Sequence, residues 1–123
     1  MRKIALVEDN PDNRLLVDAI LGDQFALREY ENGADALAGL RRNRPDLVLL
    51  DISLPGMDGT EVLRQLRADD ALRELPVIAL TAHAMAGDRE RFLALGFDAY
   101  VTKPIVDETL LLDEIARLLA SGR

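Results

Sequence analysis

The sequence predicts an α/β fold: a doubly wound, five-stranded parallel sheet built from five βα repeats, with helices on both faces. Short segments rich in Ile, Val and Leu alternate with longer amphipathic segments along the whole chain. Three of the short segments ("IALV", "LVLL" and "VIAL") are continuously apolar, which is typical of parallel strands covered on both faces. Strict βα alternation favours right-handed crossovers, which distribute the helices over the two faces of one sheet.

Each expected element has a defined range. Strands are expected at Lys3–Val7, Phe25–Tyr30, Asp46–Leu50, Pro76–Leu80 and Ala99–Thr102. Helices are expected at Pro11–Gly22, Ala34–Arg42, Thr60–Ala68, Ala84–Leu95 and Asp107–Ala120. Asn10 before Pro11 predicts an N-cap followed by proline at the first helical position. Asp58 with Glu61 resembles a capping box that uses Asp in place of Ser or Thr.

Composition excludes several function classes. The 123 residues fit one domain, and the chain has no cysteine, which excludes disulfides, thiolate nucleophiles and cysteine zinc sites. A net charge of −7 opposes binding to nucleic acid, and the lone His83 cannot form a metal cluster by itself. No apolar run is long enough for a membrane span or a signal peptide, so we expect a cytoplasmic protein with no membrane partner.

Polar residues with complementary chemistry follow four of the five expected strands. They are Glu8, Asp9, Asp51, Thr81 and Lys103. Taken singly, each is ordinary, because an acid after a strand is usually a helix cap and a lone lysine is usually a surface residue. Together they would meet at the carboxyl edge of a parallel sheet, where such folds build their sites.

Three carboxylates at one edge need a counter-charge, and Mg²⁺ is the natural partner for such an oxygen-rich set. Lys103 adds a fixed positive charge and Thr81 adds a hydroxyl donor. A metal, a lysine, a hydroxyl and backbone N–H groups would stabilise a phosphoryl group. Asp51 is therefore a candidate nucleophile that would form an acyl phosphate.

Four stretches in order resemble a known family: "ALVEDNPDNRLL", "DLVLLDISLPGMDG", "VIALTAHA" and "AYVTKPI". Their content and spacing are similar to response-regulator receiver domains of two-component signalling, over about Lys3 to Leu119. Within that family, these motifs are similar to those of receivers in hybrid sensor kinases and of single-domain regulators. The resemblance implies a flavodoxin-like strand order, 2-1-3-4-5, and a function as a phosphoacceptor switch.

The resemblance also implies roles for the acidic residues. Asp51 would take a phosphoryl group from a histidine kinase or a histidine phosphotransfer protein. Asp9 would bind Mg²⁺ directly and Glu8 through water, with Asp51 and the backbone carbonyl of Ser53 completing the protein ligands. Self-phosphorylation from a phosphodonor and slow self-dephosphorylation would be the only chemistry, so the chain is not expected to be an enzyme. Ser53 and His83 flank the site and would tune the lifetime of the phosphoryl group.

The remaining implied roles concern the switch. Thr81 and Lys103 would contact phosphoryl oxygens, and Tyr100 would be the aromatic that turns inward as Thr81 moves. The Lys103–Pro104 peptide is expected to be cis. The readout surface would be the helix at 84–95, the strand Ala99–Thr102 and the helix at 107–120. Met85, Arg89 and Phe92 are candidates on that surface, although Phe92 is better explained as a core residue.

Other functions remain open at this stage. One is a receiver-like binding module that is not phosphorylated. Another is a haloacid-dehalogenase-like phosphatase, but that chemistry needs a second Asp where this chain has Ser53.

We expect residues 1–123 to form a single receiver domain without an output domain; a natural stand-alone protein and an excised domain would look alike. Expected partners are the kinase or phosphotransfer protein and a downstream protein target, with the chain a monomer or a phosphorylation-dependent dimer. The broad apolar stripe of the first helix, including Leu15 and Leu16, would dock the phosphodonor protein.

Overall fold

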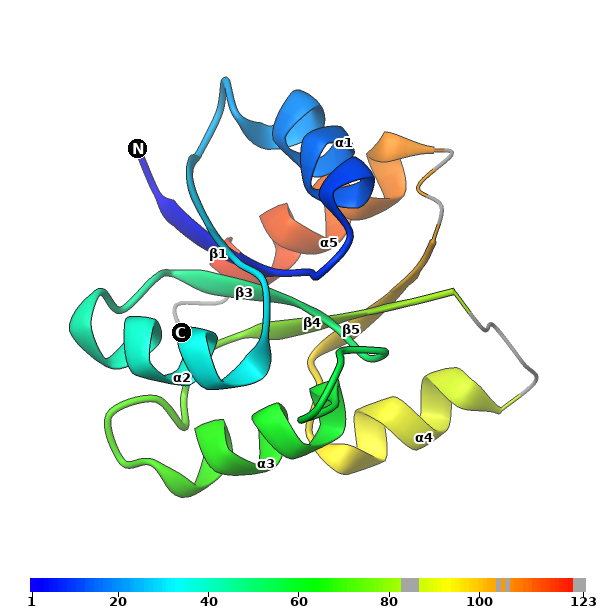
Figure 1. Cartoon of the computed structure of the whole chain (residues 1–123). Helices are drawn as coiled ribbons and strands as arrows, with labels where there is room; N and C mark the ends of the chain where they lie inside the picture. The colour runs from blue at the N-terminus through cyan, green and yellow to red at the C-terminus, as the bar shows by residue number, and fades with distance from the viewer. Residues whose placement is uncertain (83–86, 104, 106, 121–123) are drawn as a thin grey trace.

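The structure is a computed structural model that describes the whole chain except residues 83–86, 104, 106 and 121–123. Five strands alternate with five helices along the described residues (Figure 1). The strands are β1 (Lys3–Val7), β2 (Ala26–Tyr30), β3 (Leu47–Asp51), β4 (Val77–Thr81) and β5 (Ala99–Thr102). The helices are α1 (Pro11–Leu21), α2 (Gly33–Arg42), α3 (Gly59–Ala68), α4 (Asp88–Leu95) and α5 (Glu108–Ala120).

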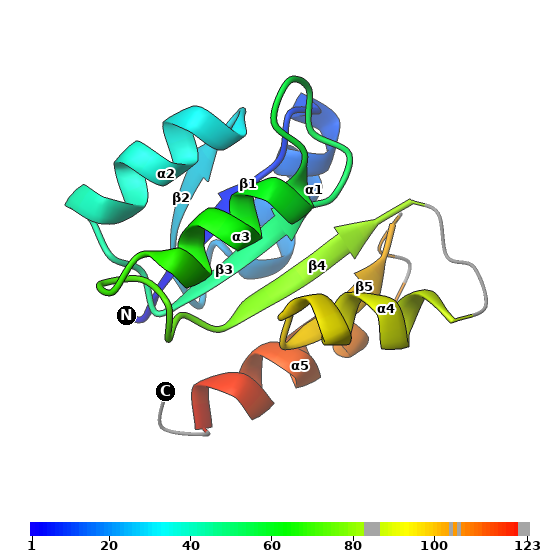
Figure 2. The ribbon, with the colours of Figure 1, turned by 90° about the horizontal axis from the view of Figure 1, so that it is seen from below.

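The five strands form one parallel sheet in the order β2-β1-β3-β4-β5, which confirms the predicted topology. Helices α1 and α5 lie on one face of the sheet, and α2, α3 and α4 lie on the other (Figures 1 and 2). The order reverses at β1, with the chain winding first to β2 and then back to β3. The crevice at the carboxyl ends of β1 and β3 is therefore the expected place for a site.

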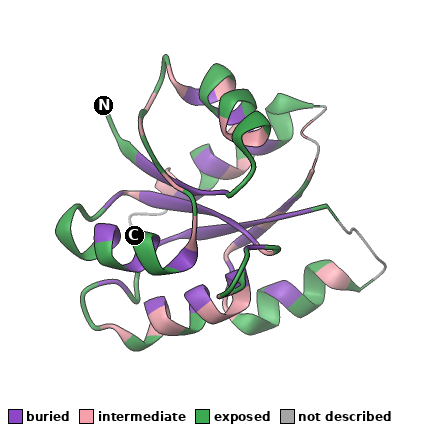
Figure 3. Ribbon diagram, in the orientation of Figure 1, coloured by how far each residue is buried: buried purple, intermediate pink, exposed green. Residues whose placement is uncertain are grey.

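The strands separate two hydrophobic clusters. In β1, Ile4 and Leu6 face the cluster under α1 and α5, whereas Ala5 and Val7 face the cluster under α2, α3 and α4. The strands β1, β3 and β4 are buried along almost their whole length (Figure 3). Burial on both faces explains why the three apolar runs in the sequence do not alternate with polar residues.

Two strands end one residue later than expected. Asp51 is the last residue of β3 and pairs with Leu80, and Thr81 is the last residue of β4 and pairs with Thr102. The ladder continues beyond them, since the amide of Ile52 donates to the carbonyl of Leu80 at 3.0 Å. The two polar residues are thus held by the sheet itself, not by the loops that follow it.

The N-caps of α1 and α3 are as expected. The Asn10 side chain accepts hydrogen bonds from the amides of Asp12 and Asn13, and the Asp58 side chain accepts from those of Thr60 and Glu61. The full capping box was wrong. The Glu61 carboxylate does not return to the Asp58 amide but pairs with Arg64 and Gln65 on the exposed side of the helix.

Helix α4 begins after a glycine N-cap. It begins at Asp88, and its N-cap is Gly87, which has a φ of 87° and supplies no side-chain hydrogen bond. Of the predicted helix at 84–95, residues 84–86 lie outside the described residues. Phe92 is the buried residue of α4, and its ring stacks on Tyr100 at 5.7 Å and meets Phe97 edge-on at 5.8 Å. Phe92 is therefore a core residue, as expected.

Among the described residues, no helix is long and apolar enough to cross a membrane.

Candidate functional site

The predicted polar residues meet at the carboxyl edge of the sheet. Glu8 and Asp9 follow β1, Asp51 ends β3, Thr81 ends β4 and Lys103 follows β5. Glu8, Asp51 and Thr81 are almost fully buried, with relative exposures of 1%, 1% and 3%. Buried polar side chains are uncommon, so three of them at or just after the ends of three strands mark this edge as the candidate site.

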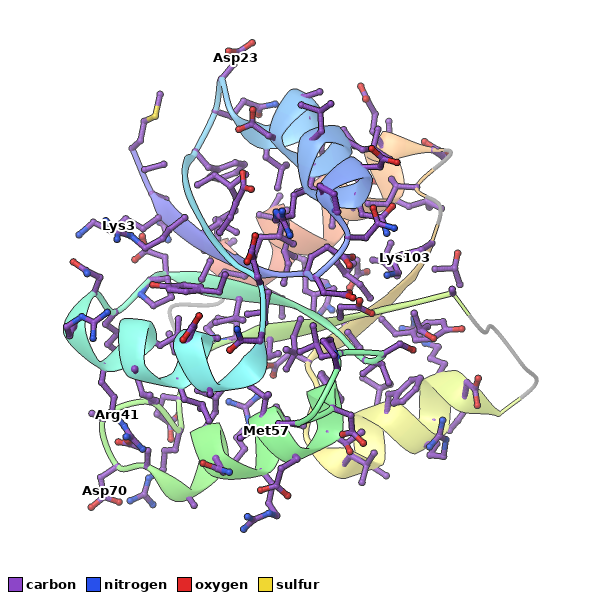
Figure 4. All side chains as sticks on the ribbon, viewed as in Figure 1. Lys3, Asp23, Arg41, Met57, Asp70 and Lys103 are labelled. Carbon is purple, nitrogen blue, oxygen red and sulfur yellow. The ribbon has the colours of Figure 1, made fainter. Side chains whose placement is uncertain are left out.

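Lys103 connects the carboxylates of two strands. Its Nζ atom lies 3.0 Å from Oε1 of Glu8 and 3.1 Å from Oδ2 of Asp51. The lysine side chain is itself only 12% exposed, so these are ion pairs largely withdrawn from water. Figure 4 shows Lys103 at the opposite end of the molecule from Lys3, which begins β1.

The local backbone orients Asp51. Its Oδ1 atom accepts a hydrogen bond from the amide of Ser53 at 3.0 Å, while Oδ2 faces Lys103. Helix α3 begins hard against the end of β3: a Cβ atom on Gly59 would lie 2.4 Å from the Asp51 carbonyl oxygen. Only glycine allows this approach, because any side chain would push the helix start away from the strand. The carboxylate is thus positioned by strand, loop and helix together.

The carboxylates of Glu8, Asp9 and Asp51 converge closely enough for a cation. One oxygen from each lies within 4.8 Å of the others, and Asp9 is exposed while the other two are buried. Mg²⁺ favours such a set, because it uses a few carboxylates and keeps several waters, which the open side at Asp9 would admit. The donor chemistry present therefore fits a hard divalent cation.

Burial and crowding change the protonation of the acidic cluster. Burial and, next, the hydrogen bond with the Asp51 carboxyl raise the pKa of Glu8 to about 7, although the hydrogen bond with Lys103 lowers it. Burial alone would lower the pKa of Lys103, but the hydrogen bond to Glu8 and the charge of Asp51 outweigh it, so that the pKa is raised. Lys103 thus stays charged, and Glu8 takes up a proton as the pH falls through about 7.

Thr81 and Tyr100 lie on the two strands next to the site. Thr81 faces the carboxyl edge from β4, and Tyr100 in β5 is half-buried with its ring on Phe92. Ser53 lies in the exposed loop after β3. His83, Met85 and Pro104 lie outside the described residues, and with them the lifetime role of His83 and the cis Lys103–Pro104 peptide.

One residue of the site was not anticipated from the sequence. Arg14, in the first turns of α1, donates from Nη1 to the carbonyl oxygens of Glu8 at 2.9 Å and Asp9 at 3.0 Å. The sequence offered one indication of this contact: Arg14 lies one helical turn after the cap residue Asn10, which itself follows the acidic pair Glu8 and Asp9.

Comparison with known proteins gives the family. The sequence model described as Response regulator receiver domain matches residues 4–116. The chain belongs to this family. It is 46% identical over 105 residues to the polar-differentiation response regulator DivK of Brucella anthropi, covering 85% of each chain.

Receivers inside sensor kinases are also similar. The chain is 41% identical over 112 residues to the sensor histidine kinase GacS of Pseudomonas protegens, covering 88% of this chain but only 12% of that protein. Among solved structures, a sensor kinase receiver domain from Pseudomonas aeruginosa PAO1, with a magnesium ion coordinated in its active-site cleft, has a TM-score of 0.87. It is 36% identical, over 97% of this chain and 98% of that one. The predicted class, a receiver domain of two-component signalling, is confirmed.

Proposed function

We propose that this receiver domain works as a phosphoacceptor switch in which Asp51 carries the phosphoryl group. The observation that carries the proposal is Lys103 bridging the buried carboxylates of Asp51 and Glu8 at 3.1 and 3.0 Å. A nucleophilic carboxylate, a fixed cation and a cluster suited to Mg²⁺ are the parts that phosphoryl transfer needs. The donor would be a histidine kinase or a histidine phosphotransfer protein.

The transfer step follows from this arrangement. A carboxylate oxygen of Asp51 attacks the phosphorus, a P–O bond forms, and the bond from phosphorus to the donor breaks, leaving its electron pair on the donor. Lys103 Nζ and the Thr81 hydroxyl would contact phosphoryl oxygens and hold charge that spreads over them. In a separate hydrolysis step, water attacks the phosphorus, the P–O bond to Asp51 breaks, and the carboxylate and inorganic phosphate are released. This step would be slow, because no second Asp stands at Ser53 to act as a base.

Glu8, Asp9 and Asp51 would hold Mg²⁺, with the carbonyl oxygen of Ser53 as a further ligand. When bound, the ion neutralises the carboxylates and the incoming phosphoryl oxygens. The same cation reported for the similar Pseudomonas aeruginosa receiver supports this choice. Ser53 and His83 would set how easily water reaches the phosphoryl group.

The output would be a change of surface on α4, β5 and α5. Thr81 would move toward the phosphoryl group and Tyr100 would turn inward, biasing an equilibrium between two conformations. Leu15 and Leu16 of α1, 69% and 37% exposed, give an apolar surface beside the site for the phosphodonor protein. A downstream protein would read α4–β5–α5 in the cytoplasm, with the domain a monomer or a phosphorylation-dependent dimer.

The test is incubation with acetyl phosphate and Mg²⁺ followed by intact-mass measurement. Wild type should gain the mass of one phosphoryl group, Asp51→Asn should gain none, and Asp58→Asn, an acidic cap in the neighbouring loop, should behave as wild type. No gain in wild type would overturn the proposal in favour of an unphosphorylated binding module. Rapid, sustained hydrolysis of para-nitrophenyl phosphate would instead favour a phosphatase.

A further inference from the structure

Arg14 reaches back from α1 onto the loop that carries Glu8 and Asp9. Side chains of a helix lean toward its N-terminus, so a residue one turn inside α1 can reach the preceding loop. Its Nη1 atom donates to the carbonyl oxygens of Glu8 and Asp9 at 2.9 and 3.0 Å. The side chain is 16% exposed; its bond to the Glu8 carbonyl is partly buried, whereas its bond to the Asp9 carbonyl is exposed.

The other nitrogens of the guanidinium bind the end of β2. Nε lies 3.4 Å from Oε1 of Glu29, and Nη2 lies 3.3 Å from Oε1 of Glu31. A planar group with donors on several edges can make these contacts together, which a lysine ammonium cannot reproduce. Arg14 therefore clamps the β1–α1 loop to the edge strand of the sheet.

The clamped carbonyls belong to two of the three residues whose carboxylates converge. Holding the peptide planes on both sides of a residue fixes its Cα–Cβ bond, and Arg14 binds the carbonyls on both sides of the Asp9 Cα atom. The loop is held from other sides as well, since the Glu8 amide donates to the Tyr30 carbonyl at 3.0 Å and the Asn10 amide donates to Oε2 of Glu8 at 3.2 Å. Without Arg14, the Asp9 carbonyl would lose this tie, and the exposed Asp9 carboxylate would have to be ordered when a cation binds.

We infer that Arg14 is a positioning residue for the metal site: it holds Glu8 and Asp9 in the arrangement that receives Mg²⁺. The inference rests on the Mg²⁺ site of the proposed function. Glu29 and Glu31 take part in the same arrangement, because their carboxylates offset the positive charge that Arg14 brings close to a cation site.

Positioning and simple electrostatics predict opposite results. If Arg14 acted only through its charge, removing it would strengthen Mg²⁺ binding, because a nearby like charge opposes a cation. If it positions the loop, removing it weakens binding. Outer-shell partners of metal ligands typically contribute a factor of about 10 to 100 in affinity.

The test is calorimetric titration of Mg²⁺ and Ca²⁺ into wild type, Arg14→Met, Arg14→Lys and Arg28→Met. Met retains the apolar stem of the side chain, and Arg28→Met removes the same charge from an exposed position on β2. Arg14→Met should lose about tenfold in Mg²⁺ affinity. Arg14→Lys should lose less, and Arg28→Met should match wild type. Ca²⁺, which tolerates irregular geometry, should lose less affinity than Mg²⁺, so the preference for Mg²⁺ should fall.

A general loss of stability would lower both affinities together and would not change that preference. Urea unfolding without metal identifies any variant that does not fold, and Arg14→Lys keeps the test open if Arg14→Met is one. Equal or tighter Mg²⁺ binding by folded Arg14→Met, or an unchanged ratio of the two affinities, overturns the inference and leaves the proposed function intact. Failure of wild type to bind Mg²⁺ overturns the proposed function itself.

Discussion

Lys103 and Glu8, 95 positions apart in the chain, form an ion pair with a distance of 3.0 Å between Nζ and Oε1. The pair joins the loop after β5 to the end of β1, and it forms inside a site where the glutamate is almost fully buried. A buried charge depends strongly on its partner, so this contact lowers the pKa of Glu8 against the larger effects of burial and Asp51, and it places a positive charge beside Asp51.

Mg²⁺ binding should strengthen as the pH rises toward neutrality. Burial raises the pKa of Glu8 to about 7 in the metal-free domain, so below that pH a cation must displace a proton. The affinity should rise up to about tenfold per pH unit below pH 7 and level off above it. Calorimetric titration across that range measures the effect. Glu8→Gln should show a flatter profile, and a wild-type affinity that does not change with pH would contradict the role of this proton.

Lys103→Met should destabilise the metal-free domain more at high pH than at low pH. Removing the lysine leaves two buried carboxylates without their cation, which costs about 3 kcal/mol where both are charged. The raised pKa of Glu8 means that this residue favours the folded state below about pH 4.5 and loses that contribution as the pH rises through about 7. Protonation of Glu8 at low pH should therefore relieve most of the loss.

Urea unfolding of Lys103→Met at about pH 8 and about pH 5.5 checks this expectation. Lys3→Met is the matched control, since Lys3 is exposed and lies at the opposite end of the molecule (Figure 4). It should change the free energy of unfolding little at either pH. Equal losses for Lys103→Met at both values would show that Glu8 does not take up the proton.

Gly59→Ala should cost more stability than Gly39→Ala, although both glycines lie in helices. Each alanine gains up to about 1 kcal/mol of helix propensity. The new Cβ at position 59 would meet the Asp51 carbonyl at 2.4 Å, whereas that at position 39 would meet the Tyr30 ring at 2.3 Å. The end of a side chain can shift more easily than a strand backbone. Overpacking at Gly59 should therefore cost about 2–3 kcal/mol net, measured by chemical unfolding.

Only the Gly59 change should disturb the site, because it moves Asp51, the proposed phosphoryl acceptor. Acetyl phosphate labelling should slow in Gly59→Ala and stay at the wild-type rate in Gly39→Ala. Equal stability and labelling in the two variants would mean that the approach of α3 to β3 does not position Asp51.

Asp58→Ala should remove the N-cap of α3 and cost about 1 kcal/mol at neutral pH. The Thr60 hydroxyl and the capped amides lower the pKa of Asp58. Its contribution is therefore full above pH 3.8 and is lost as the pH falls through the lowered value. Asp58→Asn keeps a side-chain acceptor and should cost less. Thermal unfolding of wild type, Asp58→Ala and Asp58→Asn measures these differences. If Asp58→Ala were as stable as wild type, the cap would add no stability.

Most of the architecture was predictable because it depends on local patterns. The runs Ile4–Val7, Leu47–Leu50 and Val77–Leu80 can be buried on both faces only in a covered parallel sheet. The convergence of Glu8, Asp51 and Lys103 then follows from the topology of such a sheet. Boundaries were less accurate, because the ladder bonds that draw Asp51 and Thr81 into their strands are made by other strands.

The finer contacts of the site could not be predicted from local patterns. Arg14 binds carbonyl oxygens, which every residue possesses, so no residue type marks its partners. Its ion pairs with Glu29 and Glu31 depend on the angle between α1 and the edge strand. Glu61 shows the same limitation. Its position suits a capping box, but its carboxylate pairs with Arg64 instead of returning to the N-cap amide.

The uncapped start of α4 and its single buried ring have a mechanical consequence. Gly87 gives up no side-chain bond when the first turn opens, so opening that turn breaks its backbone hydrogen bonds and the ion pair between Asp88 and Arg91, 3.6 Å apart. Because Phe92 anchors the helix and its ring lies on Tyr100 as well as against Phe97, a rotation of the tyrosine removes part of the surface on which that anchor rests. A binding partner that shifts α4 should therefore also bias the rotamer of Tyr100.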